Sequence, residues 1–233
     1  MATHVTTHNP VRADVTPVAA PRPSRRWAVA GLLAGVAGLG TMVTSGLVDA
    51  VYDETLFGDT PGVADKLAGQ TGPMFAFHSL TVIGAVLMVV FAAGLFQRLR
   101  SHTADDSAAP LVAFAGLVGT AVVSVLGSGL DTEFMMGVGQ DDMIDPANAA
   151  LYNHWIGTIP WCWVLAGLAG LAVFAVGRAG GVPRWLGVVG LVLGGLTLVA
   201  GISPLQYVAG MFGPLWLIVT AAGFCFGDRA LRS

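Results

Sequence analysis

The sequence predicts an all-α, polytopic integral membrane protein with six transmembrane helices, and three observations support this fold class. Hydrophobic residues make up 55% of the 233 residues, whereas charged residues make up only 11%. An ordinary soluble domain carries roughly 25% charged residues, so this chain has too few charged side chains to cover a soluble surface. The apolar residues also gather into six runs separated by polar segments, and each run predicts one helix.

Each apolar run is long enough, or nearly long enough, to cross a bilayer. A helix needs about 20 residues to cross ~30 Å of hydrocarbon at 1.5 Å per residue. Because backbone polar groups in lipid must be satisfied within their own segment, these runs are expected to be helices. The last two runs are slightly short, and the short connection between them predicts a tight hairpin at a membrane surface. The predicted spans are about residues 27–48, 73–96, 110–130, 149–176, 185–202 and 208–226.

The N-terminal residues 1–24 differ in composition from the rest of the chain. They include four prolines and four threonines but few large apolar side chains. Such a segment buries too little apolar surface to offset its chain entropy. We therefore expect a disordered cytoplasmic tail at 1–24, followed by one six-helix transmembrane domain over 25–233.

The distribution of charge predicts the orientation. With the amino terminus in the cytoplasm, ten of the eleven basic residues lie on the cytoplasmic side and only Lys66 lies outside. This follows the positive-inside rule and predicts a bacterial-type inner (plasma) membrane with both termini in the cytoplasm. The acidic residues in or at the two long outer segments make the outer face negative. They are Asp49, Asp53, Glu54, Asp59, Asp65, Asp131, Glu133, Asp141, Asp142 and Asp145.

Several function classes are disfavoured by the same counts. The formal net charge of −3 provides no basic surface for a nucleic acid. Cys162 and Cys225 lie inside apolar runs, so they do not suggest a disulfide framework. The chain contains no GxSxG, Walker, HExxH or CxxC motif.

The first four spans contain a short internal repeat. The first span ends with Ser-Gly-Leu-Val before Asp49, and the third ends with Ser-Gly-Leu before Asp131. Each is followed by an acidic outer loop and then by a helix with a histidine about one turn inside, His78 in the second span and His154 in the fourth. Because both units run in the same direction, they predict a parallel two-helix repeat about an axis along the membrane normal.

The repeat places four ionisable residues at one depth. Asp49 and Asp131 end outward-going helices, and His78 and His154 begin inward-going ones. Ionisable groups at this level usually face the bundle interior and suggest function. Two imidazoles and two carboxylates complete a tetrahedral zinc site, and they also suit copper, iron or manganese. The leading hypothesis is therefore a metal site, binding or catalytic, formed by Asp49, His78, Asp131 and His154.

Other functions use the same residues differently. The two histidines are placed for bis-histidine haem ligation, although the two carboxylates fit an apolar haem pocket poorly. A metal-free membrane enzyme or transporter would use the Asp and His groups for acid–base or proton chemistry. Its ligand would be a lipophilic or cationic small molecule from the outer leaflet. A structural membrane subunit would instead dock partners through its acidic outer loops. The sequence leaves these alternatives and the oligomeric state open.

Two further features bear on the site. Pro160 is expected to kink the fourth span just below His154 and to widen a cavity there. Ser79, Asn153 and an acid of the outer loops are candidates to hydrogen-bond the second nitrogen of a metal-ligating imidazole.

Overall fold

The computed structural model describes residues 25–140 and 143–227, so the tail expected at 1–24 lies outside the described residues. Within these ranges the chain is helical and no strand is found. Six helices are long and apolar enough to cross a membrane, which is compatible with an integral membrane protein. They run over Arg26–Gly46, Thr71–Arg100, Ala109–Gly137, Pro146–Arg178, Arg184–Ile202 and Gln206–Gly227.

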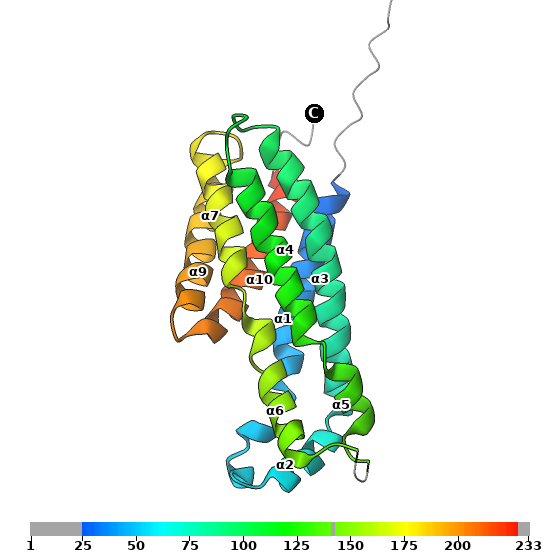
Figure 1. Cartoon of the computed structure of the whole chain (residues 1–233). Helices are drawn as coiled ribbons and strands as arrows, with labels where there is room; N and C mark the ends of the chain where they lie inside the picture. The colour runs from blue at the N-terminus through cyan, green and yellow to red at the C-terminus, as the bar shows by residue number, and fades with distance from the viewer. Residues whose placement is uncertain (1–24, 141–142, 228–233) are drawn as a thin grey trace, which may run out of the picture.

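The long helices form a closed bundle (Figure 1). Helix α1 packs against α3 on one side and α10 on the other, and α4 packs between α3 and α7. A helix that continues from α8 through the π-helical segment η4 to α9 packs on α7 and α10 and closes the bundle. The bounds are α1 (Arg26–Gly46), α3 (Thr71–Arg100), α4 (Ala109–Gly127), α7 (Val164–Arg178), α8 (Arg184–Val189), η4 (Gly190–Gly194), α9 (Gly195–Ile202), α10 (Gln206–Ala222) and η5 (Gly223–Gly227).

Glycines allow the backbones of this bundle to approach closely. A Cβ atom on Gly170 of α7 would lie 2.6 Å from the Cα atom of Gly194, and one on Gly194 would lie 2.7 Å from the Cα atom of Gly170. Side chains at these positions would force α7 and η4 apart. Small residues four positions apart typically mediate such close packing between membrane helices.

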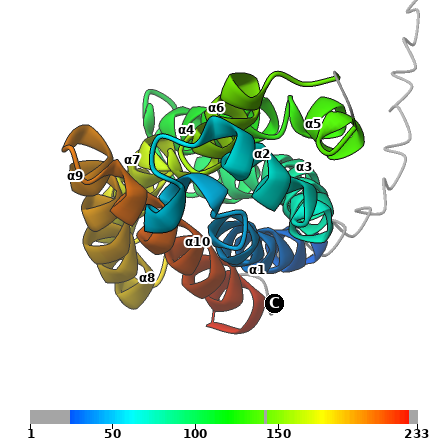
Figure 2. The same cartoon turned by 90° about the horizontal axis from the view of Figure 1, so that it is seen from below.

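A second layer of structure covers one end of the bundle. We call residues 47–70, 128–140 and 143–158 the cap; it lies at the lower end in Figure 1 and faces the viewer in Figure 2. Helix α2 packs on α6, and η1 packs on both. The elements are η1 (Ala50–Tyr52), η2 (Glu54–Leu56), α2 (Thr60–Ala68), α5 (Asp131–Gly137) and α6 (Pro146–Ile156).

The cap has its own apolar core, separate from that of the bundle. The first turns of α3 contribute to it, so α3 extends from the bundle into the cap (Figure 1). The buried members are Val48, Ala50, Val63, Leu67, Met74, Phe77, Phe134, Val138, Ala149, Tyr152 and Ile156.

The fourth apolar helix is broken where the cap meets the bundle. Helix α6 ends at Ile156, a 3₁₀ turn η3 (Ile159–Trp161) follows, and α7 begins at Val164. The expected kink at Pro160 is therefore confirmed as a full interruption. The first part of the predicted span 149–176 belongs to the cap, because the apolar face of α6 packs in the cap core.

Helix lengths predict where the cap would lie relative to a bilayer. Arg100, the last residue of α3, follows His78 by 22 residues, which corresponds to about 33 Å of helix. Helix α1 has 21 residues, which corresponds to about 31 Å. Because a hydrocarbon core is about 30 Å thick, its boundary at this end would lie near His78 and Gly46. The opposite end, which we call the basic end, carries Arg98, Arg100 and Arg178 in the last helical turns.

The repeat stays a prediction. The α1–α3 pair and the α4–α7 pair are both packed neighbours, and each pair is connected through a segment of the cap. The two cap segments nevertheless differ in their elements, since the first contains η1, η2 and α2 whereas the second contains α5 and α6.

Candidate functional site

Asp131, His78 and Tyr152 meet where the cap joins the bundle. The Nδ1 atom of His78 lies 3.0 Å from the Oδ2 atom of Asp131. The hydroxyl of Tyr152 donates a hydrogen bond of 3.0 Å to the other carboxylate oxygen, Oδ1. The three residues come from α3, α5 and α6, so the carboxylate connects three separate elements.

Packing in the cap core explains how each side chain is held. Asp131 is the first residue of α5, where the helix dipole favours a negative charge. Tyr152 is fully buried, and its ring stacks on that of Phe134 with the centroids 4.3 Å apart. Phe77, the neighbour of His78 in α3, is also fully buried in the cap core. Aromatic packing therefore sets the positions of both donors around the carboxylate.

The hydrogen bonds determine which imidazole nitrogen is available. With Asp131 ionised, its carboxylate accepts hydrogen bonds and cannot donate them, so the 3.0 Å contact then requires the proton on Nδ1 of His78. In a neutral imidazole the other nitrogen, Nε2, then presents its lone pair. Nε2 has no hydrogen-bond partner among the described residues. The His78 side chain is 35% exposed whereas that of Asp131 is 0% exposed, so the available nitrogen belongs to the accessible member of the pair.

Asp49 belongs to a different cluster within the cap. The Gln70 side-chain amide donates to its Oδ1 atom at 2.7 Å, and the Lys66 Nζ atom lies 3.0 Å from the same oxygen. Lys66 also lies 3.0 Å from Oδ2 of Asp53. The one basic residue expected on the outer side therefore pairs with two of the outer acids.

His154 lies apart from both clusters. It is exposed on α6, and its ring meets that of Tyr52 edge-on with the centroids 5.8 Å apart. Its buried neighbour Asn153 was a candidate to orient an imidazole, but it bonds the backbone instead. Asn153 donates to the carbonyl of Val48 and accepts from the N–H of Val51 at 3.0 Å.

The structure thus joins two of the four predicted site residues. Across residues 25–140 and 143–227, no group of three or more His, Cys, Asp or Glu side chains lies together in a way that could hold a metal ion. His78 and Asp131 are in contact, whereas Asp49 pairs with Lys66 and the His154 ring contacts Tyr52. The geometry of the described residues therefore does not support the four-residue ligand set, and a metal stays a prediction.

Sequence reasoning missed Tyr152. It is one of three tyrosines in the chain and lies two residues before His154. The signal that points to it is indirect: a carboxylate buried by the cap needs hydrogen-bond donors for both oxygens. The repeat pattern supplied His78 as one donor, but it carried no information on the second.

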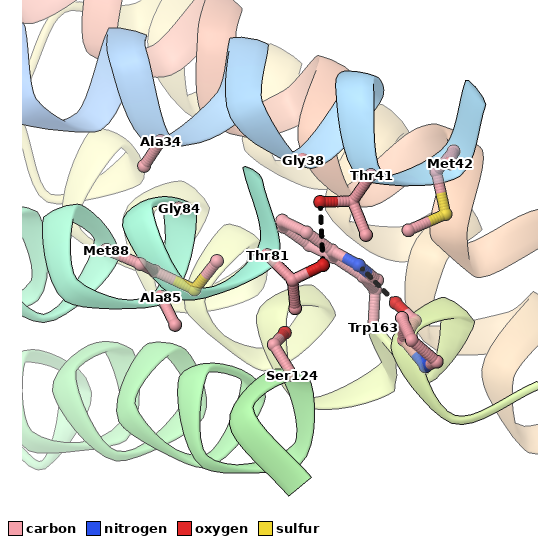
Figure 3. A pocket seen from close by; sticks show the side chains of 11 residues that line it. Ala34, Gly38, Thr41, Met42, Thr81, Gly84, Ala85, Met88, Ser124 and Trp163 are labelled. Atoms are coloured by element: carbon pink, nitrogen blue, oxygen red, sulfur yellow. Dashed lines mark hydrogen bonds between the residues drawn. The ribbon is translucent and has the colours of Figure 1, made fainter. Parts of the chain in front are cut away.

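A small cavity lies in the bundle on the side of this site that faces away from the cap (Figure 3). Thr81, one turn after His78 in α3, lines it together with Thr41 and Ser124, and the hydroxyls of Thr81 and Thr41 lie 3.2 Å apart. Pro160, at the break between α6 and α7, also lines it. Its volume is about 10 Å³, which suits a single water rather than a substrate.

The Lys66 cluster, in which Lys66 pairs with Asp49 and Asp53, is expected to make the folded cap less stable in acid. Hydrogen bonds from Thr55 and then from Lys66 lower the pKa of Asp53 to about 2, and hydrogen bonds from Gln70 and Lys66 lower the pKa of Asp49. A carboxyl whose pKa is lower in the folded state stabilises that state above its unfolded pKa of roughly 4. This stabilisation is lost as the pH falls from about 4 towards 2.

A spin label at exposed Phe57, introduced as Phe57→Cys, measures this effect. We expect its mobility to be constant from pH 7 to pH 4 and to rise towards pH 2. Lys66→Gln should raise the mobility already at neutral pH. A mobility that is the same at pH 7 and pH 2 in both proteins would contradict the stabilising role of the cluster.

No protein-family model, no curated protein and no solved structure matches the chain.

Proposed function

We propose that this chain is a multi-pass membrane protein in which His78 and Asp131 form an acid–base site at the cap end of the bundle. One observation carries the proposal. The fully buried carboxylate of Asp131 accepts hydrogen bonds on both oxygens, and one donor is the partly exposed imidazole of His78. Tyr152 positions the carboxylate by donating a hydrogen bond to its second oxygen.

The chemistry follows from the tautomer that Asp131 imposes. With the proton on Nδ1, the Nε2 atom of His78 accepts a proton from a hydroxyl group or a water next to it. The imidazolium that forms is stabilised by the adjacent negative charge of Asp131. His78 then returns the proton to the product, so the pair is a general base and acid in turn.

The depth of the site indicates the substrate class. His78 lies about one hydrocarbon thickness from the last residue of α3, near the expected boundary between lipid chains and headgroups. A molecule that reaches it from the membrane has its polar group at this level and its apolar part among the lipid chains. The proposed substrate is therefore a lipophilic molecule in the leaflet at the cap end.

A lipid-conversion assay tests this proposal. The full-length protein is reconstituted in vesicles made from polar lipids of the expression host, and the lipid species are followed by mass spectrometry. We expect conversion of one lipid class, and a rate lower by roughly 10²–10⁴-fold in His78→Gln, because general acid–base groups contribute that much. His154→Gln is the matched control: it removes an exposed histidine of the cap and should leave the rate unchanged.

Three results oppose the proposal in different ways. If the wild-type protein converts no lipid, the substrate class is wrong. If His78→Gln converts lipid as fast as the wild type, His78 serves only to hold the cap on the bundle. A chelator is not expected to change the rate. Loss of the rate on chelation, together with loss of bound metal in Asp49→Ala and His154→Ala, would replace the acid–base site by the four-residue metal site.

A further inference from the structure

An open cavity lies at the basic end, between α7 and α8. It has a volume of about 340 Å³, which is within the usual range for small-molecule sites. Two arginines lie on its wall, one at the end of α7 and one at the start of α8. The lining residues are Phe174, Gly177, Arg178, Arg184, Gly187 and Val188.

The two guanidinium groups give this cavity a positive wall. Arg178 and Arg184 are both exposed, and no acidic side chain is among the described residues that line the cavity. Neither arginine has an ion-pair partner in the part of the chain that the structure describes. Arg100 at the same end of the bundle differs, because it pairs with Asp105 at 3.4 Å.

The backbone conformation brings the two arginines to the same cavity. Gly180, with a φ of +81°, turns the chain from α7 back into α8. A Cβ atom on Gly177 would lie 3.0 Å from the Cα atom of Gly187, so these glycines let α7 and α8 approach closely.

The remaining lining residues carry no charge and include the apolar side chains of Phe174 and Val188. Val188 is 56% exposed, and the guanidinium carbon of Arg178 lies 5.9 Å from the centre of the Phe174 ring. A guanidinium within about 6 Å of a ring face is attracted to the ring, and its N–H donors match the oxygens of a phosphate. The cavity therefore combines two phosphate-binding groups with an apolar wall.

We propose that this cavity binds the headgroup of an anionic phospholipid. Arg178 and Arg184 would bind the phosphate, and the lipid chains would lie along Phe174 and Val188. Basic pockets between membrane helices on the cytoplasmic side bind such headgroups, and the positive-inside rule predicts this end to be cytoplasmic. The proposal depends on the membrane location of the chain and is independent of the acid–base site.

Native mass spectrometry of the full-length protein in detergent tests the site. Phosphatidylglycerol, phosphatidylcholine or glycerol phosphate is added at the same concentration. We expect one phosphatidylglycerol molecule to bind the wild type, with affinity reduced about tenfold or more in R178Q/R184Q, since the charge-assisted hydrogen bonds are lost. R178K/R184K keeps the charge and should bind with intermediate affinity. R100Q, the matched control at the same end, should bind like the wild type.

Three outcomes would overturn the proposal. They are equal binding of phosphatidylglycerol by R178Q/R184Q and the wild type, equal binding of phosphatidylcholine and phosphatidylglycerol by the wild type, and displacement of the lipid by glycerol phosphate. The last outcome would assign the cavity to free phosphate compounds instead. Far-ultraviolet circular dichroism, which measures helix content, and the melting temperature in detergent show whether the variants are folded. Should the double variant not fold, R178Q and R184Q are compared singly, and each should weaken binding.

Discussion

Asp131→Ala is expected to lower the free energy of unfolding by about 2–4 kcal/mol, because it removes the common acceptor of two hydrogen bonds. The Tyr152 hydroxyl is buried and would lose its partner, and Nδ1 of His78 would lose its acceptor. Asp131→Asn should cost less, about 1–2 kcal/mol, because an amide still accepts from Tyr152 through its oxygen. Unfolding in mixed micelles that contain an increasing fraction of a denaturing detergent measures the free energy of unfolding of both variants.

Glu133→Ala is the control for Asp131→Ala. Glu133 lies two residues further along the first turn of α5, and its side chain is exposed. Its removal is expected to change the free energy of unfolding by less than about 0.5 kcal/mol. Equal destabilisation by Asp131→Ala and Glu133→Ala would mean that the charge at the start of α5, rather than the three-residue contact, stabilises the cap.

Asn153→Ala is expected to have the next largest effect, about 2–3 kcal/mol. The Asn153 side chain is 0% exposed, and both of its polar atoms bond the backbone that follows α1. Without it, the carbonyl of Val48 and the N–H of Val51 are left without these partners inside the protein, and each loss costs about 1–3 kcal/mol. The same unfolding measurement applies, and hydrogen exchange of residues 48–53 should rise.

His154→Ala provides the comparison for Asn153→Ala, because it changes the next residue of α6 without removing a hydrogen bond that the structure shows. We expect a loss of less than about 1 kcal/mol, from the edge contact with Tyr52. If Asn153→Ala and His154→Ala destabilise equally, the side-chain bonds of Asn153 do not hold α6 to the end of α1.

The apolar helices were predictable from the sequence because hydropathy reports burial in either lipid or protein. The same property explains why the full break between α6 and α7 was not predicted in the fourth span. The apolar residues of α6, such as Ala149 and Ile156, are buried in the cap core. Hydropathy cannot distinguish such a face from one buried among bundle helices, so residues 149–176 read as one continuous span. Only Pro160 marked the place where the helix breaks.

The sequence predicted the depth of the candidate-site residues in the bundle, but only some of the contacts between them. Counting residues along helices placed His78 and Asp131 at one level, and the structure joins them. Residue counting could not give the direction in which each side chain points. Successive residues of a helix point about 100° apart, so Tyr152 and Asn153 face inward on α6 whereas His154 faces outward. Asp49 lies beyond the end of α1, where it pairs with Lys66, which is distant in the sequence.

The tautomer of His78 tests the central claim most directly. Nitrogen NMR of the full-length protein labelled with ¹⁵N-histidine distinguishes a proton on Nδ1 from one on Nε2, and His78→Gln identifies the signals of His78 by their loss. We expect the neutral His78 imidazole to carry its proton on Nδ1. In Asp131→Asn the amide donates to Nδ1 and the proton should move to Nε2, as the orienting role of the carboxylate requires. A neutral His78 with its proton on Nε2 in the wild-type protein would contradict the acid–base site.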